Sequence, residues 1–285
     1  MATAAIVVAS EAALALYPIL IKTVSTNLPT QLVSRFLVYS GLAFFLAKSS
    51  DIAATWGTAE GIFRSSLLGI LTLFHVGTSY YAFQELPTGV SMSLFYTYPI
   101  WNLVGAALGF GETFSGFQIL LLLLGFLGTV LVAYGSKDPD PQKQKNPYNW
   151  KGIFAGLLAA ITESAMYFAV RTAERPNPFY AILELYPGAL FLLGIMMLVS
   201  KTPLDLHPSV WTKMVSFNTI VGFIGYALRF YAIPRLPTLI FSLLSFVGVI
   251  ASFFWGYVFV HEIPSFLTLL GGVLISAVAA FSSYQ

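Results

Sequence analysis

Three ionisable residues, Glu11, His75 and Glu163, lie in the middle of long apolar stretches of the sequence. An ionised group in the hydrocarbon of a membrane costs on the order of 2.5 to 3.5 kcal/mol, so such residues usually face a cavity or a partner. Carboxylates and an imidazole in that place can bind a cationic or zwitterionic solute, or carry a proton. The alternative interpretation is structural, with each group hydrogen-bonded between helices.

Four further charged residues lie closer to the ends of apolar stretches: Arg35, Arg64, Glu184 and Arg229. Counting crossings places Glu184 and Arg229 toward the same membrane face, which predicts that they pair. An ion pair that closes one mouth of a cavity and opens in an alternate state acts as a gate, so we expect Arg35, Glu184 and Arg229 to be gating residues. The alternatives are a permanent clamp between helices and, for Arg35 and Arg64, snorkelling to lipid headgroups.

Tyrosines supply hydroxyl groups and cation-binding ring faces to a membrane pathway. Tyr17 and Tyr98 each precede a proline inside an apolar stretch, as does Tyr186, and such a proline frees a backbone carbonyl and bends the helix. Many other tyrosines of a membrane protein lie at the lipid interface. Those expected to line the pathway are Tyr17, Tyr80, Tyr96, Tyr98, Tyr167 and Tyr226.

The composition indicates a multi-pass membrane protein. Of 285 residues, 57% are hydrophobic and only 9% are charged, whereas an ordinary globular chain has about 25% charged residues. So few charged residues cannot cover a water-facing surface. The formal net charge of +2 is too small to indicate nucleic-acid binding, and the lack of cysteine excludes disulfides and thiolate sites.

The apolar stretches predict an all-α fold with ten membrane-spanning helices. A spanning helix needs about 20 mostly apolar residues at a rise of about 1.5 Å per residue. The predicted spans are 3–24, 30–47, 62–83, 88–110, 114–135, 152–172, 178–200, 210–233, 238–260 and 265–283.

The chain divides into two similar halves, 1–136 and 152–285, joined by a hydrophilic linker at 137–151. A shift of 150 residues lays the Leu-Pro-Thr of 86–88 on that of 236–238, and Glu112 on Glu262. Nearly the same shift pairs Glu11 with Glu163. Because five is an odd number of crossings, the second half enters the membrane from the opposite side. Two inverted repeats are typical of transporters that work by alternating access.

The halves resemble the drug/metabolite transporter superfamily of the EamA type. The segments that carry this resemblance are YAFQELPTGVSMSLFYTYPIWNLVGAALGFGE and YAIPRLPTLIFSLLSFVGVIASFFWGYVFVHE. The resemblance implies two inverted five-helix repeats, with the first four helices of each lining a central cavity. It also implies peripheral fifth helices, 114–135 and 265–283, which provide a surface for a homodimer. A plasma (inner) membrane is preferred and an organellar membrane is the alternative.

The sequence therefore favours a secondary active transporter of a small polar metabolite, with an amino-acid-like or amine-like solute preferred. A proton or a counter-substrate is the candidate coupling partner. The alternatives are a transporter of nucleotide sugars or sugar derivatives, and a channel or receptor-like scaffold. No GxxxxGK[ST], HExxH or GxSxG motif occurs, so we expect no ATP-driven transport, metal site, cofactor or enzymatic activity.

Overall fold

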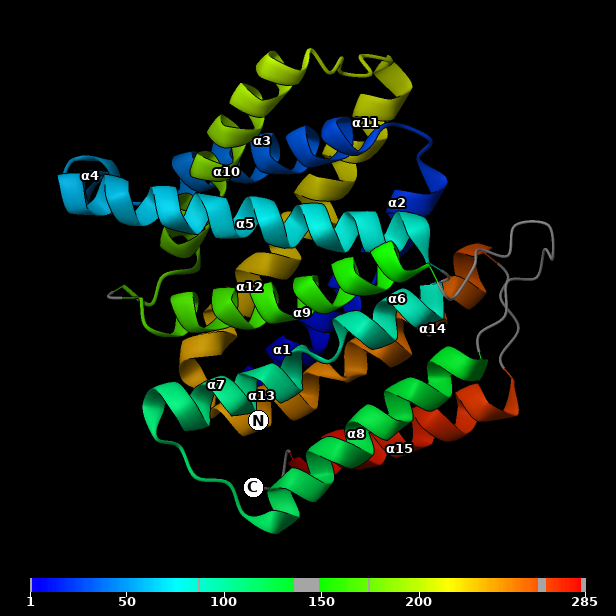
Figure 1. Ribbon diagram of the computed structural model, residues 1–285. Coiled ribbons are helices and arrows are strands. Elements are labelled where there is room, and N and C mark those ends of the chain that lie inside the picture. Colours follow the sequence, from blue (N-terminus) through cyan, green and yellow to red (C-terminus); the bar gives the residue numbers. More distant parts are fainter. Residues whose placement is uncertain (1, 87, 136–148, 174, 261–264, 283–285) are drawn as a thin grey trace.

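The computed structural model describes residues 2–86, 88–135, 149–173, 175–260 and 265–282, and the regular structure within these ranges is helical. Most of the long helices lie alongside one another (Figure 1). The predicted all-α class is therefore confirmed. The linker at 137–151 falls outside the described residues except for its last three positions.

Each predicted apolar span contains helix. The first half comprises α1 (Ala2–Leu14), α2 (Tyr17–Thr23), α3 (Leu28–Leu46), α4 (Ser49–Trp56), α5 (Ala59–Glu85), α6 (Thr88–Phe95), α7 (Tyr98–Phe110) and α8 (Gly116–Gly135). The second half comprises α9 (Trp150–Arg171), α10 (Pro178–Ser200), α11 (Pro208–Phe217), η2 (Asn218–Phe223), α12 (Ile224–Ala232), η3 (Ile233–Arg235), α13 (Thr238–Ser245), α14 (Val247–Val260) and α15 (Phe266–Ser282). The short helix α4 was not predicted, because eight residues are too few to register as a span.

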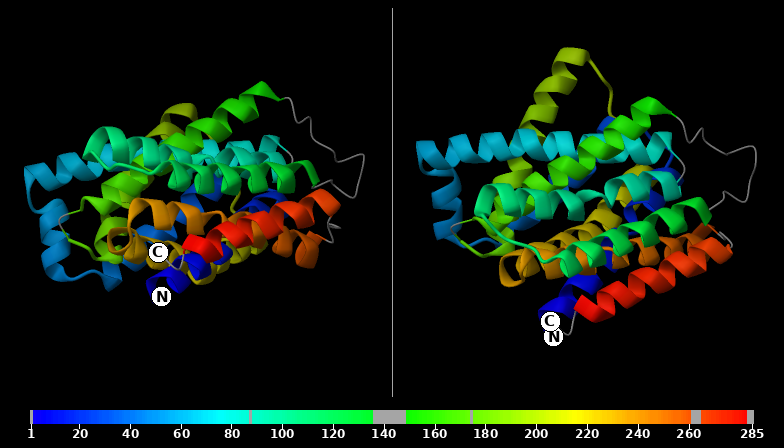
Figure 2. Two further views of the ribbon diagram at one scale, coloured as in Figure 1. Left: turned by 90° about the horizontal axis from the view of Figure 1, so that it is seen from below. Right: turned by 60° about the horizontal axis from the view of Figure 1, so that its bottom comes forward.

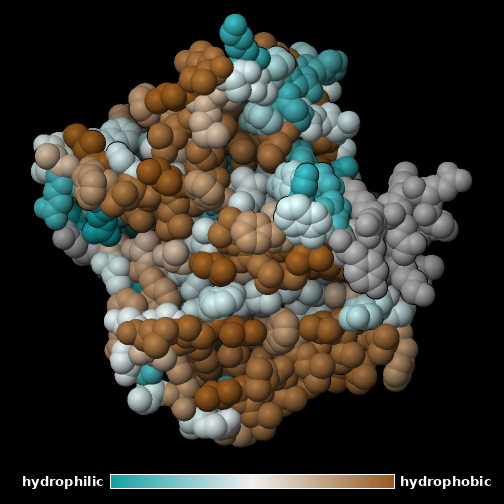
Figure 3. Space-filling model, in the orientation of Figure 1, coloured by the Kyte–Doolittle hydropathy of each residue, from teal (hydrophilic) through white to brown (hydrophobic). Residues whose placement is uncertain are grey.

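Length and hydropathy suit several of these helices to a membrane. Among the described residues, six helical stretches are long and apolar enough to cross one. They are Ala2–Thr23, Ala59–Glu85, Gly116–Gly135, Trp150–Arg171, Pro178–Ser200 and Thr238–Phe259. Figure 3 shows hydrophobic side chains covering the surface over α8 and α15, whereas hydrophilic ones gather toward the edges. This surface suits contact with lipid.

Two of the three Tyr-Pro pairs coincide with helix breaks. The break before Tyr17 separates α1 from α2, and the break before Tyr98 separates α6 from α7, whereas Pro187 lies inside a continuous α10. A third break occurs at Phe246, between α13 and α14, without a proline. At the first break the Leu16 amide donates to Ala13, and the carbonyl of Ala12 accepts from the Trp255 indole at 2.7 Å. The Trp255 indole therefore supplies the hydrogen bond that the Ala12 carbonyl loses at the helix break.

The helices around the centre pack in pairs. α5 packs against both α9 and α10, α10 also packs on α3, and α12 packs on α1. α5 and α10 approach closely because glycines meet at their crossing, where a Cβ on Gly69 would lie 2.7 Å from the carbonyl carbon of Gly188. Small residues allow such close contact between membrane helices.

α8 and α15 form a peripheral pair, side by side in Figure 1 and in the right view of Figure 2. Glycines of one helix face backbone of the other: a Cβ on Gly271 would lie 2.5 Å from the Gly128 carbonyl oxygen. The predicted homodimer through these helices stays a prediction, since their mutual contact is within one chain.

This packing predicts opposite effects for two adjacent glycines of α15. Gly271→Ala should lower the melting temperature in detergent, because its new Cβ meets the backbone of α8 and such overpacking costs about 1–3 kcal/mol. Gly272→Ala should leave the temperature unchanged or raise it, because nothing lies within 4 Å of its Cβ and alanine is up to about 1 kcal/mol better than glycine in a helix. Equal effects of the two substitutions would contradict the α8–α15 contact.

Candidate functional site

A small cavity lies among the helices of both halves. Its volume is about 40 Å³ for the centres of water-sized molecules, and one water needs about 10–15 Å³ by this measure, so a few waters fit. Five ionisable side chains line it, all at most 3% exposed: Glu11, Arg35, His75, Glu163 and Arg229. Aromatic side chains supply much of the remaining wall.

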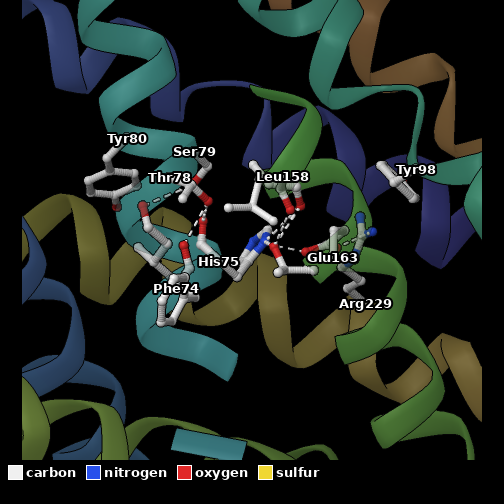
Figure 4. A network of polar contacts seen from close by, with 12 residues as sticks. Phe74, His75, Thr78, Ser79, Tyr80, Tyr98, Leu158, Glu163 and Arg229 are labelled. Atoms are coloured by element: carbon white, nitrogen blue, oxygen red, sulfur yellow. Dashed lines mark hydrogen bonds and ion pairs between the residues drawn. The ribbon is translucent and has the colours of Figure 1, made fainter. Parts of the chain in front are cut away.

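Arg229 of α12 joins the two central glutamates. Its Nη1 pairs with Glu11 Oε1, and its Nη2 lies 2.5 Å from Glu163 Oε1. His75 Nε2 lies 2.9 Å from the second carboxylate oxygen of Glu163. Figure 4 shows His75, Glu163 and Arg229 converging, with the Tyr98 ring beside Arg229. We call Glu11, His75, Glu163 and Arg229 the central ion cluster.

Tyrosine hydroxyls complete the environment of Glu11. Tyr96 donates to Oε2 at 3.1 Å and Tyr98 donates to Oε1 at 3.4 Å. The ring of Tyr98 also lies beneath Arg229, with its centroid 5.0 Å from Cζ. Gly248 makes room for this arrangement, because a Cβ there would collide with the Tyr96 hydroxyl.

The hydrogen bonds of His75 constrain a proton. Its Nδ1 lies 3.1 Å from the carbonyl oxygen of Ala159, which can only accept, so Nδ1 donates. A proton must then lie between Nε2 and the Glu163 carboxylate, because two lone pairs would repel at 2.9 Å. With this proton, Arg229 and two carboxylates, the central ion cluster has no net charge.

Comparisons with known proteins relate the sequence of this chain to membrane transporters. Residues 150–284 match the model of the EamA-like transporter family. The pseudopaline exporter CntI of Pseudomonas aeruginosa is 22% identical over 260 residues, which cover 90% of this chain and 87% of the exporter. The second half of the chain is thus similar to the EamA-like transporter family. With its apolar spans, the chain is a multi-pass integral membrane protein.

Other relatives of this chain are also transport proteins by name. The uncharacterized transporter YdfC of Bacillus subtilis is 27% identical, with 67% of this chain and 61% of YdfC covered. The probable transport protein YPL264C of Saccharomyces cerevisiae is 27% identical, with 77% and 67% covered. A crystal structure of a protein only 16% identical shares the fold, with a TM-score of 0.74 over 99% of this chain and 98% of that one.

Most of the predicted pathway residues meet at the cavity. Tyr98 contacts the central ion cluster from outside the cavity lining. Tyr167 does not line the cavity: it accepts a hydrogen bond from Arg171 at 3.0 Å, one turn further along α9. Tyr167 lies one turn after Glu163 on α9, so its hydroxyl lies at a different level along the helix axis from the Glu163 carboxylate. The predicted residues that do line the cavity are Glu11, Tyr17, His75, Tyr80, Tyr96, Glu163 and Tyr226.

The predicted pair of Glu184 with Arg229 is not formed in this conformation. Glu184 Oε1 lies 3.1 Å from Arg64 Nε and accepts from Tyr180 at 2.8 Å, while Arg229 is held by the central glutamates. The reason is helix packing: α10 carries Glu184 against α5, which carries Arg64, and α12 turns Arg229 toward α1. Arg64 therefore forms an ion pair with Glu184, in addition to any extension toward lipid headgroups.

Arg35, the third predicted gating residue, belongs to the cavity. It is 2% exposed, so snorkelling to headgroups is excluded for it in this conformation. Tyrosine rings surround it, including Tyr39 and Tyr186, which we had not assigned to the pathway. Tyr39 lies four residues after Arg35 on α3, and that spacing on a predicted helix was the available signal.

Ion pairs cluster at the end of the bundle where α4 lies (Figure 1). Arg171 pairs with Glu112 at 2.6 Å and also contacts Thr238, and Arg175 pairs with Asp51 at 2.8 Å. Together with Arg64–Glu184, these contacts connect α4, α5, α7, α9, α10 and α13, or the residues directly beside them, at this end of the bundle.

Hydrogen bonds predominate at the other end of α3 and α10. Asp205 accepts from the Thr26 hydroxyl at 2.8 Å, and its own amide donates to Thr30. The His207 amide, followed by the Thr26 hydroxyl, holds the pKa of the Asp205 carboxyl below its usual range. Hydrogen bonds therefore join Thr26 and Thr30 to Asp205 at this end.

The corrected pairing predicts a charge-swap result. Glu184→Lys should lower the melting temperature more than Arg64→Glu, since Glu184 is 2% exposed and Arg64 is 32% exposed. The double variant Arg64→Glu/Glu184→Lys should recover part of the loss. The matched control is Glu184→Lys/Arg229→Glu, which should be no more stable than Glu184→Lys. Recovery of stability in that control would instead support the Glu184–Arg229 pair predicted from the sequence.

Proposed function

We propose that this chain moves a small polar solute with a cationic amine, amino-acid-like or amine-like, by alternating access. The observation that carries the proposal is the central ion cluster, in which two buried carboxylates from different halves meet at one cavity. Carboxylates at membrane depth are suited to a cationic group. The cavity in this conformation holds only a few waters, so solute binding requires the helices to rearrange.

The proposed architecture is ten crossings in two inverted five-helix repeats, 1–136 and 152–285. The packing supports it, because α5 packs on α9 as α12 packs on α1, and each pair joins a third span to the other half's first span. Equivalent spans also meet each other, as α3 with α10, α7 with α13 and α8 with α15. Exchange of the two halves preserves this pattern, as a pseudo-two-fold axis requires.

The charge of the cluster supports proton coupling. Two carboxylates, Arg229 and one proton sum to zero, so a monovalent cation entering the closed cluster keeps it neutral only if that proton leaves. Uncompensated charge is costly in this buried setting. Exchange of a proton for the solute cation follows, with the proton leaving from between His75 and Glu163.

Export is the proposed direction. It is supported by the relative named as a pseudopaline exporter, which covers 90% of this chain. At 22% identity that name supports the direction of transport and a small-molecule cargo rather than the same cargo. The plasma membrane stays the proposed location.

The test is solute counterflow in proteoliposomes. A panel of lysine, histidine, tryptophan and their decarboxylated amines would be screened for saturable exchange. Glu11→Gln and Glu163→Gln should each lower the exchange rate at least roughly tenfold, because each removes a carboxylate that would bind the solute cation or the proton. Glu60→Gln, at an exposed carboxylate outside the cavity, should not.

Expression and detergent stability of the two variants should stay close to wild type, since the amide keeps the shape of the side chain and loss of the proton held at His75 keeps the cluster neutral. Normal exchange in both variants would make the glutamates structural. A continuous current in place of saturable exchange would indicate a channel.

A further inference from the structure

Arg35 is a buried cation that forms no ion pair with the acidic residues in the described part of the chain. It lies on α3 and lines the same cavity as the central ion cluster. Arg229, the other arginine at the cavity, has two carboxylates, but no carboxylate forms an ion pair with Arg35 among the residues that the structure describes. A buried charge normally requires such a partner.

Tyrosines take the place of the missing carboxylate. Five rings surround the guanidinium, with centroids 4.6 to 5.7 Å from Cζ: Tyr17, Tyr39, Tyr80, Tyr186 and Tyr226. Nη1 donates to the Tyr80 hydroxyl at 3.3 Å and Nη2 donates to the Tyr186 hydroxyl at 3.0 Å. Ring faces and hydroxyls stabilise a cation, but they leave its full positive charge uncompensated.

The donors of the guanidinium are not all used. A guanidinium has five N–H donors in a planar fork, and hydrogen bonds to Tyr80 and Tyr186 use two of them. The buried Nε has no hydrogen-bond acceptor in the described part of the chain. Arginine in this state is suited to a planar anion that accepts from two donors at once.

We propose that Arg35 in its tyrosine cage is an anion subsite that binds the carboxylate of the transported solute. The inference rests on the proposed function, in which the solute's amine lies at Glu11 and Glu163. With carboxylates at one part of the cavity and an uncompensated guanidinium at another, the cavity matches a zwitterion. The substrate class is therefore an α-amino acid or a related amino-carboxylate rather than a simple amine.

The charge favours a carboxylate over a phosphate. Arg35 contributes one uncompensated positive charge, which one carboxylate neutralises, whereas a phosphate dianion would leave a buried negative charge beside two glutamates. Phosphate monoesters therefore serve as the negative class in the test.

The experiment measures binding of matched acids and amides to the purified full-length protein. The probes are lysine, histidine and tryptophan, each with its carboxamide and its decarboxylated amine, and the dissociation constants come from calorimetry. At least one acid should bind wild type roughly tenfold more tightly than its amide, which keeps the amine but loses the charged carboxylate. Phosphoserine should bind no more tightly than serine.

Substitutions at Arg35 should remove this preference. In Arg35→Gln the acid and the amide should bind within about twofold of each other, and Arg35→Lys should be intermediate because it keeps the charge without the planar fork. Arg235→Gln is the control: Arg235 stacks on Tyr231 at 3.8 Å, donates to the Pro176 carbonyl at 3.4 Å, is exposed and does not line the cavity. It should keep the wild-type ratio.

Two results would overturn the anion subsite. The first is that the wild-type protein binds no acid more tightly than its amide. Absence of binding for both the acids and the amides counts as this result. The other is an unchanged acid-to-amide ratio in Arg35→Gln or, if that variant does not fold, in Arg35→Lys. If amines and amides bind and undergo counterflow while the acid preference is absent, the proposed transport stands and only the role of Arg35 falls.

Discussion

The cost of burying charge in a low-dielectric interior governs the organisation of this protein. Arg229 bridges Glu11 and Glu163, and the proton between His75 and Glu163 removes the remaining negative charge. The bridge joins α12 to α1 and α9, so the same interaction that makes the charges tolerable also connects the two halves of the chain. A solute that enters must replace part of this compensation, and that requirement links binding to rearrangement.

The helices are interrupted where the polar groups gather. Breaks before Tyr17 and Tyr98, and the π-helical segment η2, bring hydroxyls and backbone groups into the interior. Glycines provide the space: a side chain on Gly222 would collide with the Tyr17 and Tyr39 hydroxyls, which lie 2.7 Å apart, and one on Gly248 would collide with Tyr96. Irregular backbone of this kind is tolerated at membrane depth where it is buried in protein or lines a cavity.

Positions of the two halves that a sequence shift aligns carry opposite charges. A shift of 149 residues, which lays Pro29 on Pro178, also lays Arg35 on Glu184. Arg35 lies in a tyrosine cage at the cavity, whereas Glu184 pairs with Arg64 near the mouth where the other ion pairs gather. Of these two aligned positions, Arg35 lines the cavity and Glu184 does not, so the chemistry of the two halves differs at this place.

The sequence by itself determined the helical class, the limits of most apolar helices, and the presence of Glu11, His75 and Glu163 at the interior, because hydropathy and the cost of isolated charges are local properties of the chain. It did not determine partners. The pairing of Glu184 with Arg64, the bridge from Arg229 across 218 residues to Glu11, and the displacement of Tyr167 depend on which faces of which helices meet. Only the tertiary structure decided these, because the rotation of each helix is set by close contacts such as Gly69 with Gly188, which a single sequence does not reveal.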